Sequence, residues 1–327
     1  MPEHIDYYPI FTRSIDDINF IEMFEKQLPQ NIRTIIDNSK GNIYNKPLST
    51  QISSDQLMQI TKDFFENIDS EISSQVNSIL DGKDNRFNLN IDSNGNGENQ
   101  VSNPNRIPID IDVTQYGDLR DVYGLVHELT HCLDIDNGDT DTRKILGEVA
   151  PQCMERLLDK YLMENCELLG FNSEMLSKDI EKRKLSTFVS RAQNAINFNN
   201  LRKSNPTTRT LEQEKDSRYV LAQIYQSQLM KYDTVSTKNK LVDFINCIKN
   251  NDFYGANKAF GMQIEKNNQL QRENFVISSV IEGKDLYNKL LENAKENGKE
   301  DVVRWANSDL DGLFEYIKQR DRIFDER

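Results

Sequence analysis

Apolar residues recur every three or four positions over most of the chain, which is the spacing of an amphipathic helix. The first clear run extends from position 53 to 79 and comprises Leu57, Ile60, Phe64, Ile68, Ile72, Val76 and Ile79. Similar runs cover residues 122–133 and about 142–169. Beyond them the pattern predicts five or six more helices, with breaks near Gly170, Asn205-Pro206, Asn250-Asn251 and Gly298. The fold class we expect is therefore mainly α.

The period changes to two between residues 87 and 113. The alternating apolar positions are Phe87, Leu89 and Ile91, and then Ile107, Ile109, Ile111 and Val113. A turn-rich stretch, residues 92–99, lies between the two runs. This pattern predicts a β-hairpin or small sheet with a long loop, directly before the helix at 122–133. The loop begins like a calcium-binding loop, but Asn103 stands where a calcium-binding glutamate is needed, so we do not expect calcium there.

Two segments differ in character along the chain. Residues 1–52 are polar, with only short apolar groups, and we expect a weakly defined, irregular N-terminal segment. Residues 53–327 predict a single, mostly helical domain without an internal repeat.

The composition excludes some partners. The net charge is −13, which makes nucleic acid and anionic membrane surfaces poor partners. No Sec-type signal and no membrane-spanning apolar run is present, so we expect a soluble protein that is cytoplasmic or exported by a route without a Sec signal peptide. The four cysteines lack CxxC spacing, which favours reduced, buried thiols.

The strongest chemical motif is His127-Glu128-Leu129-Thr130-His131, an HExxH pattern on a predicted helix. Two imidazoles four residues apart lie on the same helix face and can bind one zinc ion. Glu128 lies beside them, where it can act as a general base towards an attacking water. The alternative is a pair of core histidines with no metal.

A catalytic zinc site usually has three protein ligands, and the only other histidine is His4. A carboxylate is therefore expected as the third ligand. Glu148 can return beside His131 if the helix at 142–169 runs antiparallel to the first. Glu155, two turns further along, would orient a ligand or be an ordinary surface or interhelix carboxylate. The nearer carboxylates favour a solvated acidic turn, and they are Asp134, Asp136, Asp139 and Asp141. Asp134 and Asn137 also replace the glycine and histidine that a metzincin requires.

Two blocks of sequence resemble the thimet oligopeptidase and oligoendopeptidase F family of zinc peptidases, and more closely its oligoendopeptidase F branch. They are residues 116–131, YGDLRDVYGLVHELTH, and residues 147–155, GEVAPQCME. A weaker match is Asp63-Phe64-Phe65, and the resemblance covers roughly residues 60–235. It implies a helical shell around a deep channel, cleavage of short peptides, and zinc held by the two histidines and Glu148. It also gives the β-hairpin a role, since an edge strand can pair with an extended substrate.

The chain departs from this family in two respects. Family enzymes are much longer, so the missing N-terminal helices predict a more open cleft. Family members also use a C-terminal histidine and tyrosines at the oxyanion, but no histidine follows His131 here. The corresponding stretch contains Arg218, Tyr219 and Tyr225. Tyr219 matches the family's segment best, so we expect its hydroxyl in the cleft, with Arg218 or Tyr225 as further hydrogen-bond donors to the oxyanion. The alternative is that both tyrosines are helix aromatics packed in the core.

These residues predict a zinc endopeptidase or oligopeptidase acting on a peptide or protein, and the short chain leaves room for a specialised effector or toxin protease. The main alternative is a catalytically inactive protein with a peptidase fold that binds peptides or proteins. A structural zinc protein would normally offer four ligands rich in cysteine, and the cysteine spacing here does not provide them.

Overall fold

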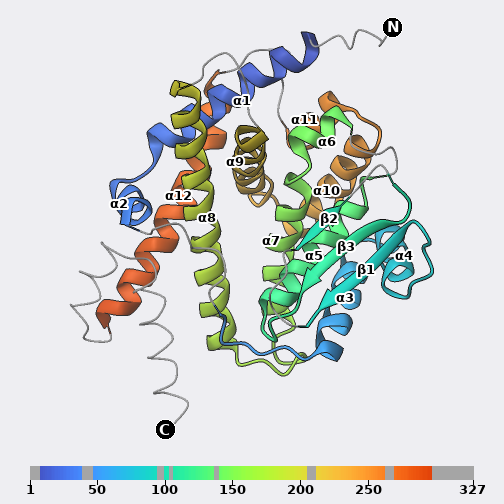
Figure 1. The fold of residues 1–327 in the computed structure, drawn as a ribbon. Helices are drawn as coiled ribbons and strands as arrows, with labels where there is room; N and C mark the ends of the chain where they lie inside the picture. The colour runs from blue at the N-terminus through green and yellow to red at the C-terminus, as the bar shows by residue number, and fades with distance from the viewer. Residues whose placement is uncertain are drawn as a thin grey trace, which may run out of the picture.

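A computed structural model describes residues 8–38, 47–93, 99–102, 106–135, 140–204, 211–261 and 269–296. These parts of the chain are mainly helical, with one small sheet, which confirms the predicted class (Figure 1). Before the sheet come α1 (Tyr8–Gln27), α2 (Gln30–Asn38), α3 (Ser54–Ile68) and α4 (Ser70–Leu80). After it come α5 (Arg120–Cys132), α6 (Asp141–Leu146), α7 (Val149–Glu164), α8 (Ser173–Ser204), α9 (Leu211–Leu229), α10 (Thr234–Lys249), α11 (Phe253–Ala259) and α12 (Gln269–Glu296). None of the helices described is both long and apolar enough to cross a membrane.

Two runs that the sequence predicts as single helices are each divided. Asp69 ends α3 and caps α4, because its carboxylate accepts hydrogen bonds from the backbone N–H groups of Glu71 and Ile72. The second run is divided at Gly147 and Glu148, between α6 and α7. The apolar period continues across both breaks, so periodicity alone could not reveal them.

The predicted breaks at Gly170 and Asn250-Asn251 are confirmed, since Gly170 lies between α7 and α8 and the asparagines lie between α10 and α11. Those at Asn205-Pro206 and Gly298 lie outside the described residues. A further break, between α9 and α10, was not predicted.

The sheet contains β1 (Phe87–Asp92), β2 (Gln100–Ser102) and β3 (Ile109–Thr114), in the order β1-β3-β2. The two predicted runs pair in parallel, in a register that begins with Phe87 opposite Ile109. The prediction that they form a hairpin is therefore wrong, and the antiparallel pair is β2 with β3. A period of two identifies the faces of a strand but not its direction. The connection between the runs is long enough for β2 to form within it.

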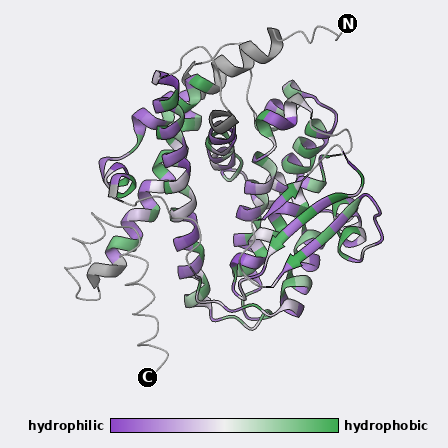
Figure 2. Cartoon of the chain, viewed as in Figure 1, coloured by the Kyte–Doolittle hydropathy of each residue, from purple (hydrophilic) through white to green (hydrophobic). Residues whose placement is uncertain are grey.

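The N-terminal helices correct the expectation of an irregular segment. Phe20, Ile21 and Phe24 of α1 and Ile32 and Ile35 of α2 are buried in the same core as the rest of the chain. Helix α1 packs against α8, α9 and α12 (Figure 1). Hydrophobic and hydrophilic residues share most helices, as amphipathic packing requires (Figure 2).

Residues 48–52 join α8 to the start of α5. The backbone N–H groups of Ser49 and Thr50 and the Thr50 hydroxyl donate hydrogen bonds to the carboxylate of Asp179 on α8. The Leu48 N–H donates to Asp118, just before α5, and Ile52 N–H donates to the Gly117 carbonyl. This segment therefore links α8 by hydrogen bonds to the start of the helix that carries the HExxH motif.

Replacing Asp179 with alanine should destabilise the fold. The change leaves the buried donors of residues 49 and 50 without an acceptor and removes the ion pair with Lys182. We expect a loss of about 3 kcal/mol in the free energy of unfolding, measured by urea denaturation. Asp243→Ala on the exposed side of α10 is the matched control, with an expected change within about 0.5 kcal/mol. Equal losses of unfolding free energy in the two variants would contradict the stabilising role that we assign to the contacts between Asp179 and residues 48–52.

Candidate metal centre

Helix α5 is fixed by packing on nearly every side. Val122, Leu125 and Leu129 are fully buried, and the helix contacts α3, α7 and β3. In its first turn, the Asp121 carboxylate accepts hydrogen bonds from the backbone N–H groups of Tyr116 and Gly117 at 2.7 and 2.8 Å. The motif is thus presented by a rigid helix.

The structure brings together the three residues that the sequence predicts as metal ligands. The Nε2 atoms of His127 and His131 lie 3.2 Å apart. Glu148, in the junction between α6 and α7, places Oε2 3.4 Å from Nε2 of His127 and Oε1 3.7 Å from Nε2 of His131. The antiparallel approach of α7 to α5 that the sequence suggests is the packing that delivers this carboxylate.

These separations fit a shared metal ion. Ligands held at zinc–nitrogen distances of 2.0–2.1 Å in a tetrahedron lie about 3.3 Å from one another. The Oε2 atom of Glu148 is buried and has no hydrogen-bond donor among the described residues. His127 directs Nδ1 at a carboxylate, so its Nε2 carries a lone pair when the ring is neutral. The ligand atoms of His127, His131 and Glu148 therefore converge on one point, where they could hold a metal ion.

The electrostatics of the cluster also favour a cation. Burial lowers the pKa of His131 to about 3, so this ring is neutral and able to ligate. Burial opposes ionisation of Glu148, but the hydrogen bond and charge of His127 and the charge of Arg191 help to outweigh it, so the pKa of Glu148 is lowered. Burial likewise disfavours a charged His127, yet Glu148 and Glu155 raise the pKa of His127 well above its usual value. The same carboxylates that attract a proton would attract a metal ion.

Glu128 is almost completely buried on the same helix. Burial, opposed by His127 and reinforced by Glu148, raises the pKa of Glu128 to about 7. A carboxylate in this environment can exchange a proton near neutral pH.

Glu155 orients one of the ligands. Nδ1 of His127 donates a hydrogen bond of 2.7 Å to Oε1 of Glu155, which is 8% exposed. Burial excludes the alternative of an ordinary surface carboxylate, whereas the ion pair with Arg183 of α8 makes Glu155 an interhelix carboxylate as well. A carboxylate on Nδ1 fixes the tautomer and the orientation of the ring.

The predicted solvated turn is wrong for Asp134. This residue is 1% exposed, and its Oδ1 accepts a 2.8 Å hydrogen bond from Arg143 on α6. The sequence could not show that α6 brings Arg143 back over the turn. Asp136, Asp139 and the side chain of Asp141 lie outside the described residues.

Among the oxyanion candidates, Tyr219 and Arg218 lie on the wall formed by α8 and α9. The Arg191 guanidinium stacks 4.2 Å from the centre of the Tyr219 ring. Arg191 acts electrostatically on Glu148, and Arg218 acts on His131, so both guanidinium groups lie near the cluster. The Nε atom of Arg218 is buried without a hydrogen-bond partner among the described residues.

Tyr225 is placed in the core instead. Its hydroxyl donates a 2.6 Å hydrogen bond to Asn257. Its ring packs against Phe20, Phe260 and Phe275. This position does not fit the prediction of Tyr225 as an oxyanion donor. It fits the alternative, a helix aromatic packed in the core.

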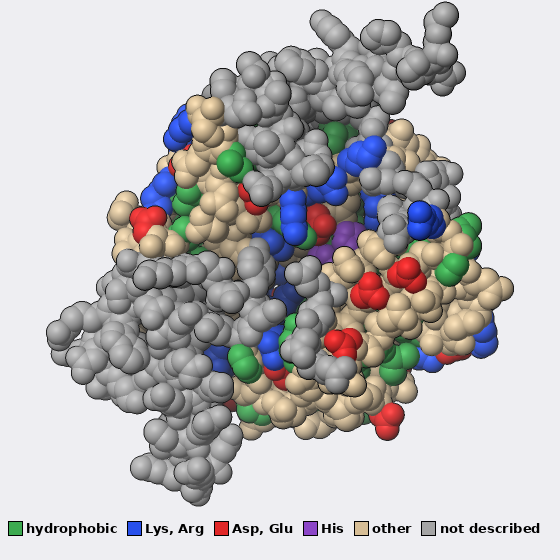
Figure 3. Space-filling model, in the orientation of Figure 1, with side chains coloured by type: hydrophobic (Ala, Val, Ile, Leu, Met, Phe, Trp, Pro, Cys, Tyr) green, Lys and Arg blue, Asp and Glu red, His purple; other side chains and the backbone are tan. Residues whose placement is uncertain are grey.

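The cluster lies at the floor of a hollow. Figure 3 shows histidine near the centre of one face, with several Lys and Arg side chains around it. His127 and His131 are the histidines that the structure describes. The position gives a ligand access to the cluster from solvent.

Sequence reasoning missed two arginines at this site, Arg183 and Arg191, both on α8. Arg183 pairs with Glu155, and Arg191 stacks on Tyr219. No spacing rule connects them with the HExxH motif, because they reach it from another helix.

Removing Glu148 should release the metal. Glu148→Ala deletes one of three ligands, so zinc affinity should fall by at least tenfold in a chelator competition titration. Glu164→Ala, an exposed carboxylate at the end of the same helix, is the control and should bind zinc normally. Asp134→Ala would be a poor control because breaking its buried pair with Arg143 would itself destabilise the protein. Normal zinc affinity in Glu148→Ala would refute the ligand assignment.

Comparisons with protein-family models, with curated proteins and with solved structures found no match to the chain. The resemblance to the thimet oligopeptidase and oligoendopeptidase F family therefore rests on the residues of the two blocks that contain the cluster.

Proposed function

We propose that the protein is a zinc-dependent peptidase that cleaves peptide bonds in a peptide or protein substrate. The observation that carries this proposal is the convergence of His127, His131 and Glu148 at separations of 3.2–3.7 Å, with Glu128 next to His127 on the same helix. A structural metal site has no use for an additional buried carboxylate beside the ligands. A hydrolytic site needs one as a proton acceptor.

The roles of the residues follow from their positions. His127, His131 and Glu148 would hold the ion, and Glu155 would orient His127. A bound zinc ion would polarise the scissile carbonyl and acidify water. Glu128 would accept a proton from the attacking water and return it to the leaving amine.

Tyr219 and Arg218 are the proposed donors to the oxyanion. Both belong to α9; Arg218 acts electrostatically on His131, and Tyr219 is stacked with Arg191, which acts on Glu148. Donors fixed before the reaction stabilise developing charge at no reorganisation cost. Arg191, stacked on Tyr219, would restrict the tyrosine ring. Tyr225 is not part of this proposal because its hydroxyl is engaged by Asn257.

Strand β2 offers a means of holding an extended substrate. It is an edge strand and packs against α5, so its unpaired side could add the backbone of a peptide to the sheet. We propose a peptide or protein as the partner. Nucleic acid and membranes are not proposed, because the chain carries a net charge of −13. A specialised effector or toxin protease that acts on a protein substrate is one form of this proposal.

A second candidate is a peptide-binding protein on an inactive peptidase scaffold. It is favoured by one observation, the absence of any histidine after His131, where the resembled family uses one at the oxyanion. This candidate predicts zinc and peptide binding without cleavage.

The test is digestion of a broad peptide library by the purified full-length protein, read by mass spectrometry. We expect cleavage that stops when zinc is removed with a chelator and returns when zinc is restored. Zinc-loaded protein that binds peptides but leaves the library and denatured protein substrates intact would refute the peptidase and support the binding protein.

A further inference from the structure

We propose that Arg183 is a positioning residue for the metal centre and sets the orientation of His127 through Glu155. The inference rests on the zinc site of the proposed function but not on peptide cleavage. Arg183 lies on α8, outside both sequence blocks that carry the ligands.

One carboxylate is divided between two partners. Oε1 of Glu155 accepts the hydrogen bond from Nδ1 of His127, and Oε2 is ion-paired with the guanidinium of Arg183. Both Glu155 and Arg183 are largely buried, with side-chain exposures of 10% and 17%. Since both oxygens are engaged, the carboxylate cannot rotate without losing one of these contacts. Arg183 therefore limits rotation of the Glu155 carboxylate, and that carboxylate in turn fixes the orientation of the His127 ring.

Helices α5 and α7 support Arg183 with a repeated pair of contacts. Tyr123 lies four residues before His127 on α5, and Asp159 lies four residues after Glu155 on α7. The Tyr123 hydroxyl donates a 2.5 Å hydrogen bond to Asp159, about one helical turn from the contact between His127 and Glu155 on these antiparallel helices. The Arg183 guanidinium lies 3.6 Å from the centre of the Tyr123 ring. One face of the guanidinium is thus covered by the ring, while its edge meets Glu155.

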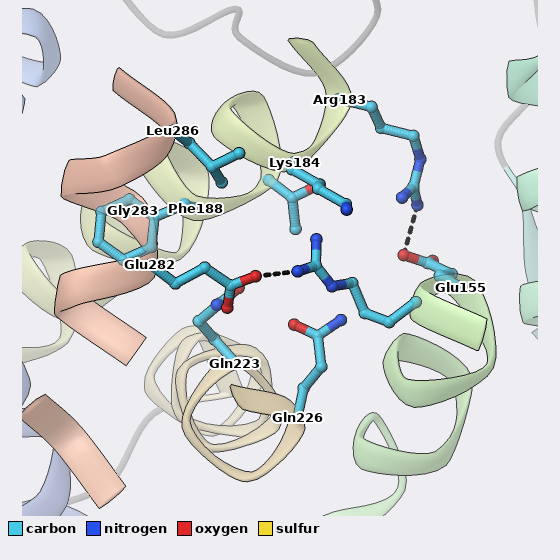
Figure 4. A pocket seen from close by; sticks show the side chains of 11 residues that line it. Glu155, Arg183, Lys184, Phe188, Gln223, Gln226, Glu282, Gly283 and Leu286 are labelled. Atoms are coloured by element: carbon cyan, nitrogen blue, oxygen red, sulfur yellow. Dashed lines mark hydrogen bonds and ion pairs between the residues drawn. The ribbon is translucent and has the colours of Figure 1, made fainter. Parts of the chain in front are cut away.

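The surroundings leave little room for water. A cavity of about 10 Å³ lies beside Arg183 and Glu155, which is space for roughly one water molecule. Figure 4 shows Arg183 directed at Glu155. Arg156 and Glu282, which also line the cavity, form a separate ion pair. In such a site water screens the ion pair only weakly. Removing the Arg183 guanidinium therefore leaves the buried Glu155 carboxylate without its positively charged partner. The cavity itself is too small for a substrate group.

Arg183→Gln tests the inference. It removes the charge and keeps a side chain of moderate length. The zinc dissociation constant, measured by competition with a chromophoric chelator and without substrate, should rise about 10–100-fold. Arg202→Gln is the matched control, because it makes the same change on the same helix at an arginine that pairs with Glu22 of α1 rather than with Glu155. Its dissociation constant should stay within about twofold of wild type.

A double-mutant cycle separates positioning from general stability. Glu155→Gln alone should weaken zinc binding by a similar factor, and Arg183→Gln added to it should cause little further change. Arg183→Lys, which keeps the charge but loses the planar contacts, should bind zinc more tightly than Arg183→Gln. If Arg183→Gln fails to fold by circular dichroism, the comparison of Arg183→Lys with Arg202→Gln decides, and equal zinc affinities would overturn the proposal.

Unchanged zinc affinity in Arg183→Gln would also overturn the proposal. So would an equal loss of zinc affinity when Arg183→Gln is introduced into the wild type and into Glu155→Gln. These results are independent of peptide cleavage. A protein that shows the expected coupling but cleaves no peptide would retain this inference and lose the proposed function.

Discussion

Glu128→Gln should reduce kcat for peptide cleavage by about 10²–10⁴-fold while zinc binding remains normal. Glutamine has nearly the same shape as glutamate and no basic oxygen, so the variant loses the proton acceptor but no ligand. Glu128 is buried beside His127, and its pKa is raised to about 7 mainly by burial, which is the environment of a group that exchanges protons near neutral pH. The measurement is kcat on a peptide from the library, with zinc content determined on the same sample.

Glu164→Gln is the control for this comparison, because it makes the same chemical change at an exposed position on α7. It should cleave at the wild-type rate. If Glu128→Gln retains full activity with normal zinc content, Glu128 is not the base and the mechanism proposed above is wrong.

Tyr219→Phe should reduce kcat by about 10²–10³-fold and change KM much less. The substitution removes one hydroxyl donor but keeps the ring on which Arg191 stacks at 4.2 Å. A donor that acts on developing negative charge contributes to the transition state more than to substrate binding.

Tyr225→Phe separates the two candidate tyrosines. It removes the hydrogen bond to Asn257 and should lower the melting temperature without changing kcat. The opposite pattern, with a fall in kcat for Tyr225→Phe and none for Tyr219→Phe, would reject Tyr219 as the donor.

The metal cluster could be predicted because its geometry is largely local. Residues four apart on a helix share a face, so the motif alone places His127 beside His131. Glu148 follows after a short reversal, and the helix that follows it delivers Glu155 two turns later. The sequence could not decide whether Glu155 was buried, because that depended on the packing of α8.

The features that escaped prediction depend on distant segments. Arg183 and Arg191 reach the site from α8, and Tyr225 is taken into the core by aromatic residues of α1 and α12 and a residue that follows α11. Whether β1 and β3 pair in parallel or antiparallel depends on the path of the chain that connects them. Helices α1 and α2 were missed because their apolar positions are interrupted near Pro29, which hides the period.

The position of the ligands within the chain connects metal supply to folding. All three lie within residues 127–148, and closing so short a loop costs little chain entropy, whereas Arg183 joins only when α8 docks. An ion that binds the folded protein but not the unfolded chain adds about 2.7 kcal/mol of stability when its free concentration is 100 times the dissociation constant. The lifetime of the folded protein against proteolysis would then rise and fall with the free zinc of its surroundings.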